Sequence, residues 1–305
     1  MDKFKAMEAF ARVVDTGSFT RAAELMGAPK ASVSTLVQEL EAQLGVRLLN
    51  RTTRKVAVTA DGAAYYERCI RLIDDMREAD EAVSSRQGKP TGRLRVDVAT
   101  SLGSLLMYAG LSEFMARYPD IKLEIGCSDR LINLVSEAVD CVIRIGEASD
   151  PGVVARRVGS MRLLTCASKA YAEAHGVPQH PSELSQHRWI GYFPAQSPGQ
   201  IYPAVFSRDG EHIELTPPCM LALNDSNVYE DALHAGLGIG CLPSYVMACE
   251  EKAKGLVEVL PEWAAEPIPI YVLYPSNRHL STRVQAFVDW VAELFERYPD
   301  LRRAG

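Results

Sequence analysis

The sequence predicts an α/β protein in which an N-terminal winged helix-turn-helix and a linker helix precede a two-lobed α/β body. Three observations support this architecture. Two short helical patterns flank a tight turn within residues 19–40, and a seven-residue apolar repeat covers 60–87. Strand and helix patterns alternate from residue 94 onward, and a chain of 305 residues is long enough for two or more such units.

The Gly-Lys-Pro-Thr-Gly segment at 88–92 breaks the long helix and is typical of a hinge. We therefore expect a winged helix-turn-helix domain at 1–59, a dimerisation helix with its hinge at 60–90, and the body at 91–305. Within the body we expect a first lobe at about 91–161 and 268–305 and a second lobe at about 162–267.

The first domain opens with a helical pattern at about 3–14. A second short helix stops at Gly27, and a third, after the turn, carries Val33, Val37 and Leu40 on one side. This is the pattern of a helix-turn-helix, whose second helix can enter the DNA major groove. β-forming and basic residues then alternate around a tight bend at 46–59, which predicts a two-stranded wing.

The charge distribution agrees with a nucleic-acid partner for the first domain alone. The whole chain carries a formal net charge of -6. Residues 1–59 hold nine basic and six acidic side chains, so the remainder of the chain carries all of the excess negative charge. A mildly basic head on an acidic body suits a DNA-reading module whose affinity depends on dimerisation.

The helix at 60–87 carries an apolar seam whose members recur in steps of four and three, the mark of a coiled coil. A helix packed only on its own domain would also show an apolar stripe. We predict pairing between chains, because a second stripe at Tyr66, Ile70 and Ile73 is left to contact the protomer. The predicted dimerisation residues are Tyr65, Cys69, Leu72, Met76, Ala79 and Val83.

The body alternates strands and helices, which predicts parallel sheets with helices on both faces, and Asp209-Gly210 adds one hairpin. The predicted strands are 94–99, 122–127, 141–145, 162–166, 221–223, 239–242, 257–260 and 268–273. The predicted helices are about 102–116, 130–138, 168–174, 227–235, 244–252 and 281–297.

Other function classes find little support in the sequence. It contains no G-x-S-x-G, P-loop or H-E-x-x-H motif, and its six histidines lack ligand spacing, so we expect no enzyme activity, cofactor or metal. The seven cysteines form no C-x-x-C motif, which favours buried thiols in a reducing cytosol and leaves a redox pair open. Neither a signal peptide nor a membrane span is apparent, so we expect a cytoplasmic protein without a membrane partner.

The ordered motifs of the chain resemble those of the LysR-type transcriptional regulator family along nearly its whole length. The head carries Gly17-Ser18-Phe19-Thr20, Ala22-Ala23, Val33-Ser34, Leu40-Glu41, Leu44-Gly45-Val46, Leu48-Leu49, Arg51-Thr52-Thr53-Arg54, Thr59 and Gly62. The body carries Ser128-Asp129-Arg130, Asp140, Ile143-Arg144-Ile145-Gly146, Ala155-Arg156-Arg157, Cys166-Ala167-Ser168, Tyr171, Asn224-Asp225, Gly236-Leu237-Gly238-Ile239 and Leu242-Pro243.

The resemblance implies a winged helix-turn-helix, a dimerising linker helix and an effector-binding domain at 91–305, similar in fold to type 2 periplasmic binding proteins. It implies double-stranded operator DNA, a small-molecule effector and further copies of the chain as partners, assembled as a dimer or a homotetramer in the bacterial cytoplasm. It leaves RNA polymerase open as a partner. The chain departs from the family at Pro29, Thr35 and Gln38 of the head, so a target sequence cannot be transferred from other members. It also departs at Ser226 in the body, so the shape of that turn cannot be transferred either.

The predicted DNA contacts lie on the third helix and on the wing. Short hydroxyl side chains let a helix sit deep in the groove, Ala31 offers a methyl contact to thymine, and Gln38 can pair with adenine. The arginines of the wing can bind phosphates or enter the minor groove. The predicted contacts are Lys30, Ala31, Ser32, Ser34, Thr35, Gln38, Arg51, Thr52, Thr53 and Arg54.

The predicted effector site lies where strands of the body turn into helices, because free backbone N–H groups there favour an anion. Ligands of α/β sheets bind beyond the carboxyl ends of strands, so these turns are expected to converge on one cleft between the lobes. The predicted residues are Thr100, Ser101, Ser128, Arg144, Tyr192, Asn224 and Ser226.

Each of these residues also has an ordinary structural interpretation. Serine, threonine and aspartate are standard helix caps, and Asp225 is expected to be a cap or a tie between lobes. Arg144 can pair with an anionic effector or with a structural acid, and Tyr192 and Phe193 can stack on an aromatic ligand or belong to the core. The family implies a small carboxylate or aromatic acid as the effector.

Three other functions compete with this interpretation. A solute-binding protein would explain the body but requires export, and an enzyme would require a nucleophile and base or a metal set. A constitutive or redox-driven regulator would need no small effector, and thiol alkylation under oxidant would distinguish it from ligand control.

We predict that replacing Arg51 or Arg54 by alanine weakens binding to all DNA sequences and flattens the dependence of affinity on salt, because phosphate contacts release counterions. Replacing Ser32 or Gln38 should instead alter sequence preference. Titrations at several salt concentrations measure both effects, and an unchanged salt slope for the arginine variants would count against phosphate contact.

Overall fold

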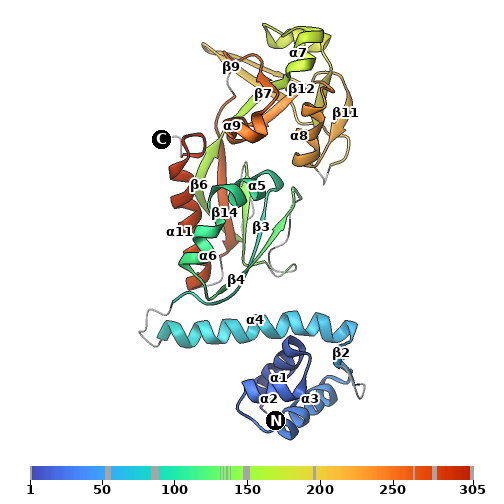
Figure 1. Ribbon diagram of the computed structural model, residues 1–305, viewed down its shortest axis with the longest axis vertical. Helices are drawn as coiled ribbons and strands as arrows, with labels where there is room; N and C mark the ends of the chain where they lie inside the picture. The colour runs from blue at the N-terminus through green and yellow to red at the C-terminus, as the bar shows by residue number, and fades with distance from the viewer. Residues whose placement is uncertain are drawn as a thin grey trace. The chain divides into compact units, whose positions relative to one another are not determined.

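The computed structural model describes residues 2–51, 56–83, 89–130, 132, 134, 137, 139–146, 152–194, 197–263, 265–276 and 280–302. The chain forms two compact units, Met1–Gly88 and Lys89–Gly305 (Figure 1). No helix among the described residues combines the length and apolar character needed to cross a bilayer.

The first unit is a winged helix-turn-helix followed by a long helix. Its elements are α1 (Lys3–Thr16), α2 (Phe19–Leu25), α3 (Lys30–Leu44), the antiparallel pair β1 (Leu49–Arg51) and β2 (Val56–Val58), and α4 (Ala60–Val83). Ser18 caps α2 through its side chain, whereas Pro29, the residue before α3, offers no side-chain cap and accepts from the Ser32 and Val33 N–H groups through its carbonyl. Residues 84–87 of the predicted long helix lie outside the described residues.

The helices of the first unit enclose one apolar core. Phe10 of α1 is fully buried at its centre, and Val33, Val37 and Leu40 turn the inner face of α3 toward it. Cys69 and Ile73 bring α4 into the same core. This packing fixes which side of α3 faces outward.

Side chain–backbone hydrogen bonds connect the wing to α3 and to the start of α4. Glu41 Oε1 accepts hydrogen bonds from the backbone N–H groups of Leu48 and Leu49 at 2.9 and 3.0 Å. The Thr59 hydroxyl donates to the Arg47 carbonyl at 2.8 Å and accepts from the Gly62 N–H at 2.9 Å. A Cβ added at Gly62 would lie only 2.0 Å from the Leu48 carbonyl oxygen, which explains a glycine in the Thr59-x-x-Gly62 motif.

The second unit is built on two sheets, which define its two lobes. The first lobe has the sheet β4–β3–β5–β14–β6. In this sheet β3 runs parallel to both of its neighbours, β4 and β5, whereas β14 runs antiparallel to both of its neighbours, β5 and β6. Its elements are β3 (Gly92–Val98), α5 (Thr100–Ala109), α6 (Leu111–Arg117), β4 (Ile121–Cys127), β5 (Cys141–Ile145), β6 (Val153–Met161), β14 (Ile268–Pro275), α11 (Thr282–Arg297) and η2 (Pro299–Leu301).

The second lobe has the sheet β11–β8–β12–β7–β13 and the antiparallel hairpin β9–β10, which forms at the predicted Asp209-Gly210 turn. The strands are β7 (Leu163–Ser168), β8 (Trp189–Tyr192), β9 (Ala204–Arg208), β10 (Glu211–Leu215), β11 (Cys219–Leu223), β12 (Ile239–Pro243) and β13 (Leu256–Glu258). The helices are α7 (Lys169–His175), η1 (Pro181–Gln186), α8 (Ser226–His234), α9 (Ser244–Ala248) and α10 (Glu250–Ala253).

Both sheets are mixed, so the prediction of purely parallel sheets is wrong. In the first lobe the chain returns from the second lobe as β14, which runs antiparallel between β5 and β6. In the second lobe β12 pairs with β7 in antiparallel register, with Cys241 opposite Thr165. The chain passes between the sheets twice, and a returning strand need not keep the direction of its neighbours.

Two predicted helices of the body differ from the structure. The helix predicted at 102–116 is broken into α5 and α6 at Gly110, whose φ of 156° lies outside the range of an α-helix. The helix predicted at 130–138 is not seen in the described residues there, which lie in bends, turns or irregular backbone. The strands β6 and β8 were not predicted from the sequence pattern.

We predict that Gly62→Ala destabilises the first unit by about 2 kcal/mol, because the new methyl group collides with the Leu48 carbonyl. Helix propensity alone predicts the opposite sign, since alanine is favoured over glycine by about 1 kcal/mol inside a helix. Thermal unfolding followed by circular dichroism measures the difference, and a raised melting temperature would contradict the steric argument.

Candidate functional site

The outward face of α3 carries most of the residues predicted to read DNA. Lys30, Ala31, Ser32, Thr35 and Gln38 are exposed, and Ser34 is half-buried. The first turn of α3 therefore presents backbone N–H groups, a lysine and short hydroxyl side chains on one surface. This combination favours phosphate oxygens and base edges.

The side chain of Thr35 has a partner within the helix. Its hydroxyl donates to the Ala31 carbonyl at 3.0 Å, so its oxygen remains available as an acceptor. On the wing, Arg51 ends β1, but its side chain is not described. Thr52, Thr53 and Arg54 lie outside the described residues, so their predicted roles stay predictions.

The predicted seam of α4 divides into residues that pack inward and residues that do not. Leu72 and Met76 expose 54% and 48% of their surface, whereas Cys69 exposes 0%. The structure corrects the prediction for Cys69, which is buried in the core of its own unit, and the Tyr65 ring packs 6.0 Å from Phe10. The side chains of Ala79 and Val83 are not described.

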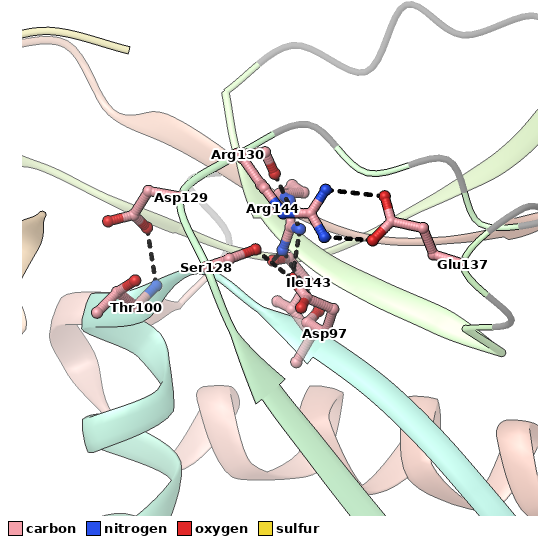
Figure 2. Close-up of polar contacts among 8 residues, drawn as sticks. All are labelled: Asp97, Thr100, Ser128, Asp129, Arg130, Glu137, Ile143 and Arg144. Carbon is pink, nitrogen blue, oxygen red and sulfur yellow. Dashed lines mark hydrogen bonds and ion pairs between the residues drawn. The ribbon is translucent and has the colours of Figure 1, made fainter. Parts of the chain in front are cut away.

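In the second unit, Asp97 on β3 organises two of the predicted effector residues (Figure 2). Arg144 Nη2 on β5 lies 2.5 Å from Asp97 Oδ1, and the Ser128 hydroxyl donates to the same oxygen at 3.1 Å. Arg144 Nη1 also donates to the Ile143 carbonyl at 3.0 Å. The structure therefore gives Arg144 a structural acid as its partner, one of the two roles left open by the sequence.

Asp129, the residue after Ser128, gathers three more of the predicted residues. Its Oδ1 accepts from the Thr100 N–H at 2.8 Å, a contact that Figure 2 shows. Its Oδ2 accepts from the Ser226 hydroxyl at 2.8 Å and from the Tyr192 hydroxyl at 3.0 Å. Thr100 belongs to the first lobe, whereas Tyr192 and Ser226 belong to the second.

A second contact joins the lobes beside Asp129. The Tyr245 hydroxyl on α9 donates to Ser101 Oγ on α5 at 2.7 Å. We call the set Thr100, Ser101, Asp129, Tyr192, Ser226 and Tyr245 the lobe junction.

Asn224 contributes to the lobe junction through its backbone, because its carbonyl accepts from Tyr192 at 3.3 Å. Asp225 caps α8 by accepting from the N–H groups of Asn227 and Val228 at 2.9 and 3.0 Å. Asp225 is therefore a helix cap, one of the two roles expected from the sequence, whereas Asp129 contacts both lobes.

The tyrosines of the lobe junction are held as hydrogen-bond donors. Burial raises the pKa of Tyr192, and the neighbouring charge of Asp129 raises it further. Burial likewise raises the pKa of Tyr245. The Tyr192 ring stacks on Tyr202 at 6.3 Å and meets Tyr229 edge-on at 5.6 Å, so its faces contact aromatic rings of its own lobe.

Sequence reasoning missed Asp97, Asp129 and Tyr245 as site residues. The sequence did contain a signal for Asp97: it is a lone acid between Val96 and Val98 in an apolar strand, and a buried acid requires a partner. Asp129 offered a weaker signal, since it is the second residue after the second strand of the body. Tyr245 had none, because its partner Ser101 lies in the other lobe.

Burial raises the pKa of five thiols. It raises the pKa of Cys69 and of Cys241 to about 11, and it raises the pKa of Cys127, Cys141 and Cys166. Raised values disfavour the thiolate, which is the form that oxidants attack. Among the described residues, no group of three or more His, Cys, Asp or Glu side chains is arranged to hold a metal ion.

Comparison with known proteins agrees with this division of the chain. Residues 4–63 match the family described as bacterial regulatory helix-turn-helix protein, lysR family, and residues 87–296 match the LysR substrate binding domain. The chain is 38% identical to an HTH-type transcriptional repressor of Pseudomonas aeruginosa (strain UCBPP-PA14), over 99% of this chain and 95% of the relative.

Further similarities extend over nearly the whole chain. The HTH-type transcriptional activator AaeR of Escherichia coli (strain K12) is 30% identical over 97% of this chain and 94% of its own length. The structure of CrgA, a LysR-type transcriptional regulator from Neisseria meningitidis, matches with a TM-score of 0.59 and 31% identity, over 95% of this chain and 97% of that chain.

The fold and the exposed face of α3 define a DNA-binding regulator of transcription with a two-lobed effector-binding domain. The chain belongs to the LysR-type transcriptional regulator family.

We predict that Asp97→Asn destabilises the second unit by about 3 kcal/mol, because it leaves the guanidinium of Arg144 without a counter-charge where both side chains are only 14% and 13% exposed. Glu137→Gln is the matched control, since its partner Arg130 is 53% exposed and surface pairs contribute about 0–1 kcal/mol. Denaturant unfolding followed by tryptophan fluorescence compares the two, and equal losses would contradict a structural role for the Asp97 pair.

Proposed function

We propose that this regulator binds operator DNA as a dimer or a dimer of dimers and that a small molecule bound between the two lobes modulates it. The observation that supports DNA reading most directly is the orientation of α3. Its apolar side chains Val33, Val37 and Leu40 are buried, and its polar first turn faces solvent. A helix presented in this way can enter the major groove with Ser32 and Gln38 toward base edges.

Pairing of two heads is supported by the linker helix. Leu72 and Met76 lie four residues apart on α4, so these two exposed apolar side chains share one face of the helix. A second copy of the same helix would bury them across a coiled-coil seam. Two heads held in this way would meet two half-sites of a roughly palindromic operator. A further contact through the bodies would build the tetramer.

The effector is proposed to be a small anionic or aromatic carboxylate. Thr100, Ser101, Tyr192 and Ser226 place hydrogen-bonding groups from both lobes within one junction. A molecule that binds these groups changes how the lobes are joined. We infer that this change alters the spacing of the heads on DNA and the bend of the DNA, which is the step that couples effector to transcription.

The competing functions find less support. The relatives named above are transcriptional regulators, which argues against an enzyme or a solute carrier. The raised pKa of five of its thiols argues against oxidation at those five cysteines. Relatives named as a repressor and as an activator both align along the chain, so the direction of control is not part of the proposal. The site of action is the bacterial cytoplasm, where the DNA lies.

We predict that the purified protein protects two half-sites in the DNA upstream of its own gene, and that the double change Leu72→Asp with Met76→Asp abolishes this footprint. Charges at the seam disfavour pairing, and one head alone makes too few phosphate contacts for stable binding. Ala64→Asp, at another exposed position of α4, is the control and should preserve the footprint. Footprinting and light scattering measure binding and mass, and a monomeric variant with an intact footprint would contradict the proposal.

A further inference from the structure

Asp129 joins the two lobes through a single carboxylate. It is the second residue after β4 in the first lobe, and one of its oxygens accepts from the Thr100 N–H at 2.8 Å. The other oxygen accepts from two hydroxyls of the second lobe, Ser226 at 2.8 Å and Tyr192 at 3.0 Å. The contact therefore links the end of one strand, the start of α5 and two elements of the opposite lobe.

Among the described residues, no helix cap competes with Asp129 for the Thr100 N–H or the Ser226 hydroxyl, and the Tyr192 and Ser226 hydroxyls also contact each other at 3.4 Å. α5 begins after Ala99, which supplies no side-chain cap, so Asp129 provides the acceptor for the first turn of this helix. α8 already has its own cap in Asp225, which leaves the Ser226 hydroxyl free to reach across to the other lobe. Tyr192 is aligned by the Asn224 carbonyl.

Asp97 and Asp129 differ in the charge of the groups that contact them. Asp97 is neutralised by Arg144. In the described part of the chain, Asp129 is met by neutral hydrogen-bond donors and by no cation. Such an arrangement of an N–H group at a helix start and two hydroxyls suits one carboxylate, and a second carboxylate at the same place would be repelled.

We propose that Asp129 is an internal ligand of the lobe junction, which ties the two lobes together without a small molecule and which an acidic effector must displace. The tie between the lobes stands on the contacts of Asp129 alone, and only the displacement step rests on the proposed effector function. Asp129 thereby determines specificity, because a carboxylate effector has to compete with a tethered carboxylate for Thr100, Tyr192 and Ser226.

The tie is tested by hydrogen–deuterium exchange of the full chain in the absence of DNA. In Asp129→Ala, amides at the start of α5 and at the start of α8 should exchange about tenfold faster, the change expected for losing a charge-assisted hydrogen bond. The effect on α8 is decisive, because this helix belongs to the other lobe. Glu137→Gln, which removes a carboxylate paired with Arg130 of the same lobe, should leave α8 unchanged.

Sodium formate tests whether the vacated place accepts a carboxylate. Formate should slow exchange in Asp129→Ala relative to sodium chloride at equal ionic strength, and it should leave the wild-type protein unchanged. If the alanine variant fails to fold, the isosteric Asp129→Asn serves instead, with a smaller rise at α8 because its amide nitrogen cannot accept from Ser226 or Tyr192.

Two results would overturn the proposal: unchanged exchange at α8 in both variants, or rescue by chloride equal to rescue by formate. Neither result concerns DNA binding. Loss of the operator footprint with a normal exchange response at α8 would refute the proposed function and leave the internal ligand intact, so the two failures are distinguishable.

Discussion

The requirement that partly buried acids find partners shapes the second unit of this protein. Asp97 lies on a central strand of the first lobe, and Arg144 from the adjacent strand neutralises it at 2.5 Å. Because a buried charge without a partner is costly, this pair constrains both strands and the turn that carries Ser128. The Ser128 hydroxyl, in turn, brings Asp129 to the edge where the second lobe begins. The contacts that Asp129 makes with the second lobe therefore depend on how these acids are satisfied.

In the first unit, packing fixes which face of α3 points toward solvent. Phe10 and the inner side of α3 share a dry core with Cys69 of α4, so α3 cannot rotate without exposing apolar surface. Glu41 holds the chain at the end of α3 where it enters the wing. The linker helix α4 thus has two faces. One packs in the core of its own unit, and the other exposes Leu72 and Met76 to solvent.

Much of the fold could be predicted because the relevant signals are local. The helix-turn-helix follows from apolar spacing around Gly27, and the hairpin of the second lobe follows from Asp209-Gly210. The site was predicted less completely. Thr100, Ser128 and Ser226 could be named as candidates because hydroxyl residues at strand ends and helix starts are visible in a sequence, whereas Tyr245 was missed because its partner lies 144 residues away. The mixed sheets were not predicted, because the direction of β14 depends on how the chain returns from the second lobe to the first.

The sequence by itself determined the regulator family, the helix-turn-helix and the chain positions where polar groups end strands, because each rests on residues close together in the chain. Tertiary structure alone decided that Arg144 belongs to Asp97, that Cys69 lies inside the head and that Asp129 bridges the lobes. Partner choice among charged and hydroxyl groups depends on distances between segments far apart in sequence. Only the folded chain sets those distances.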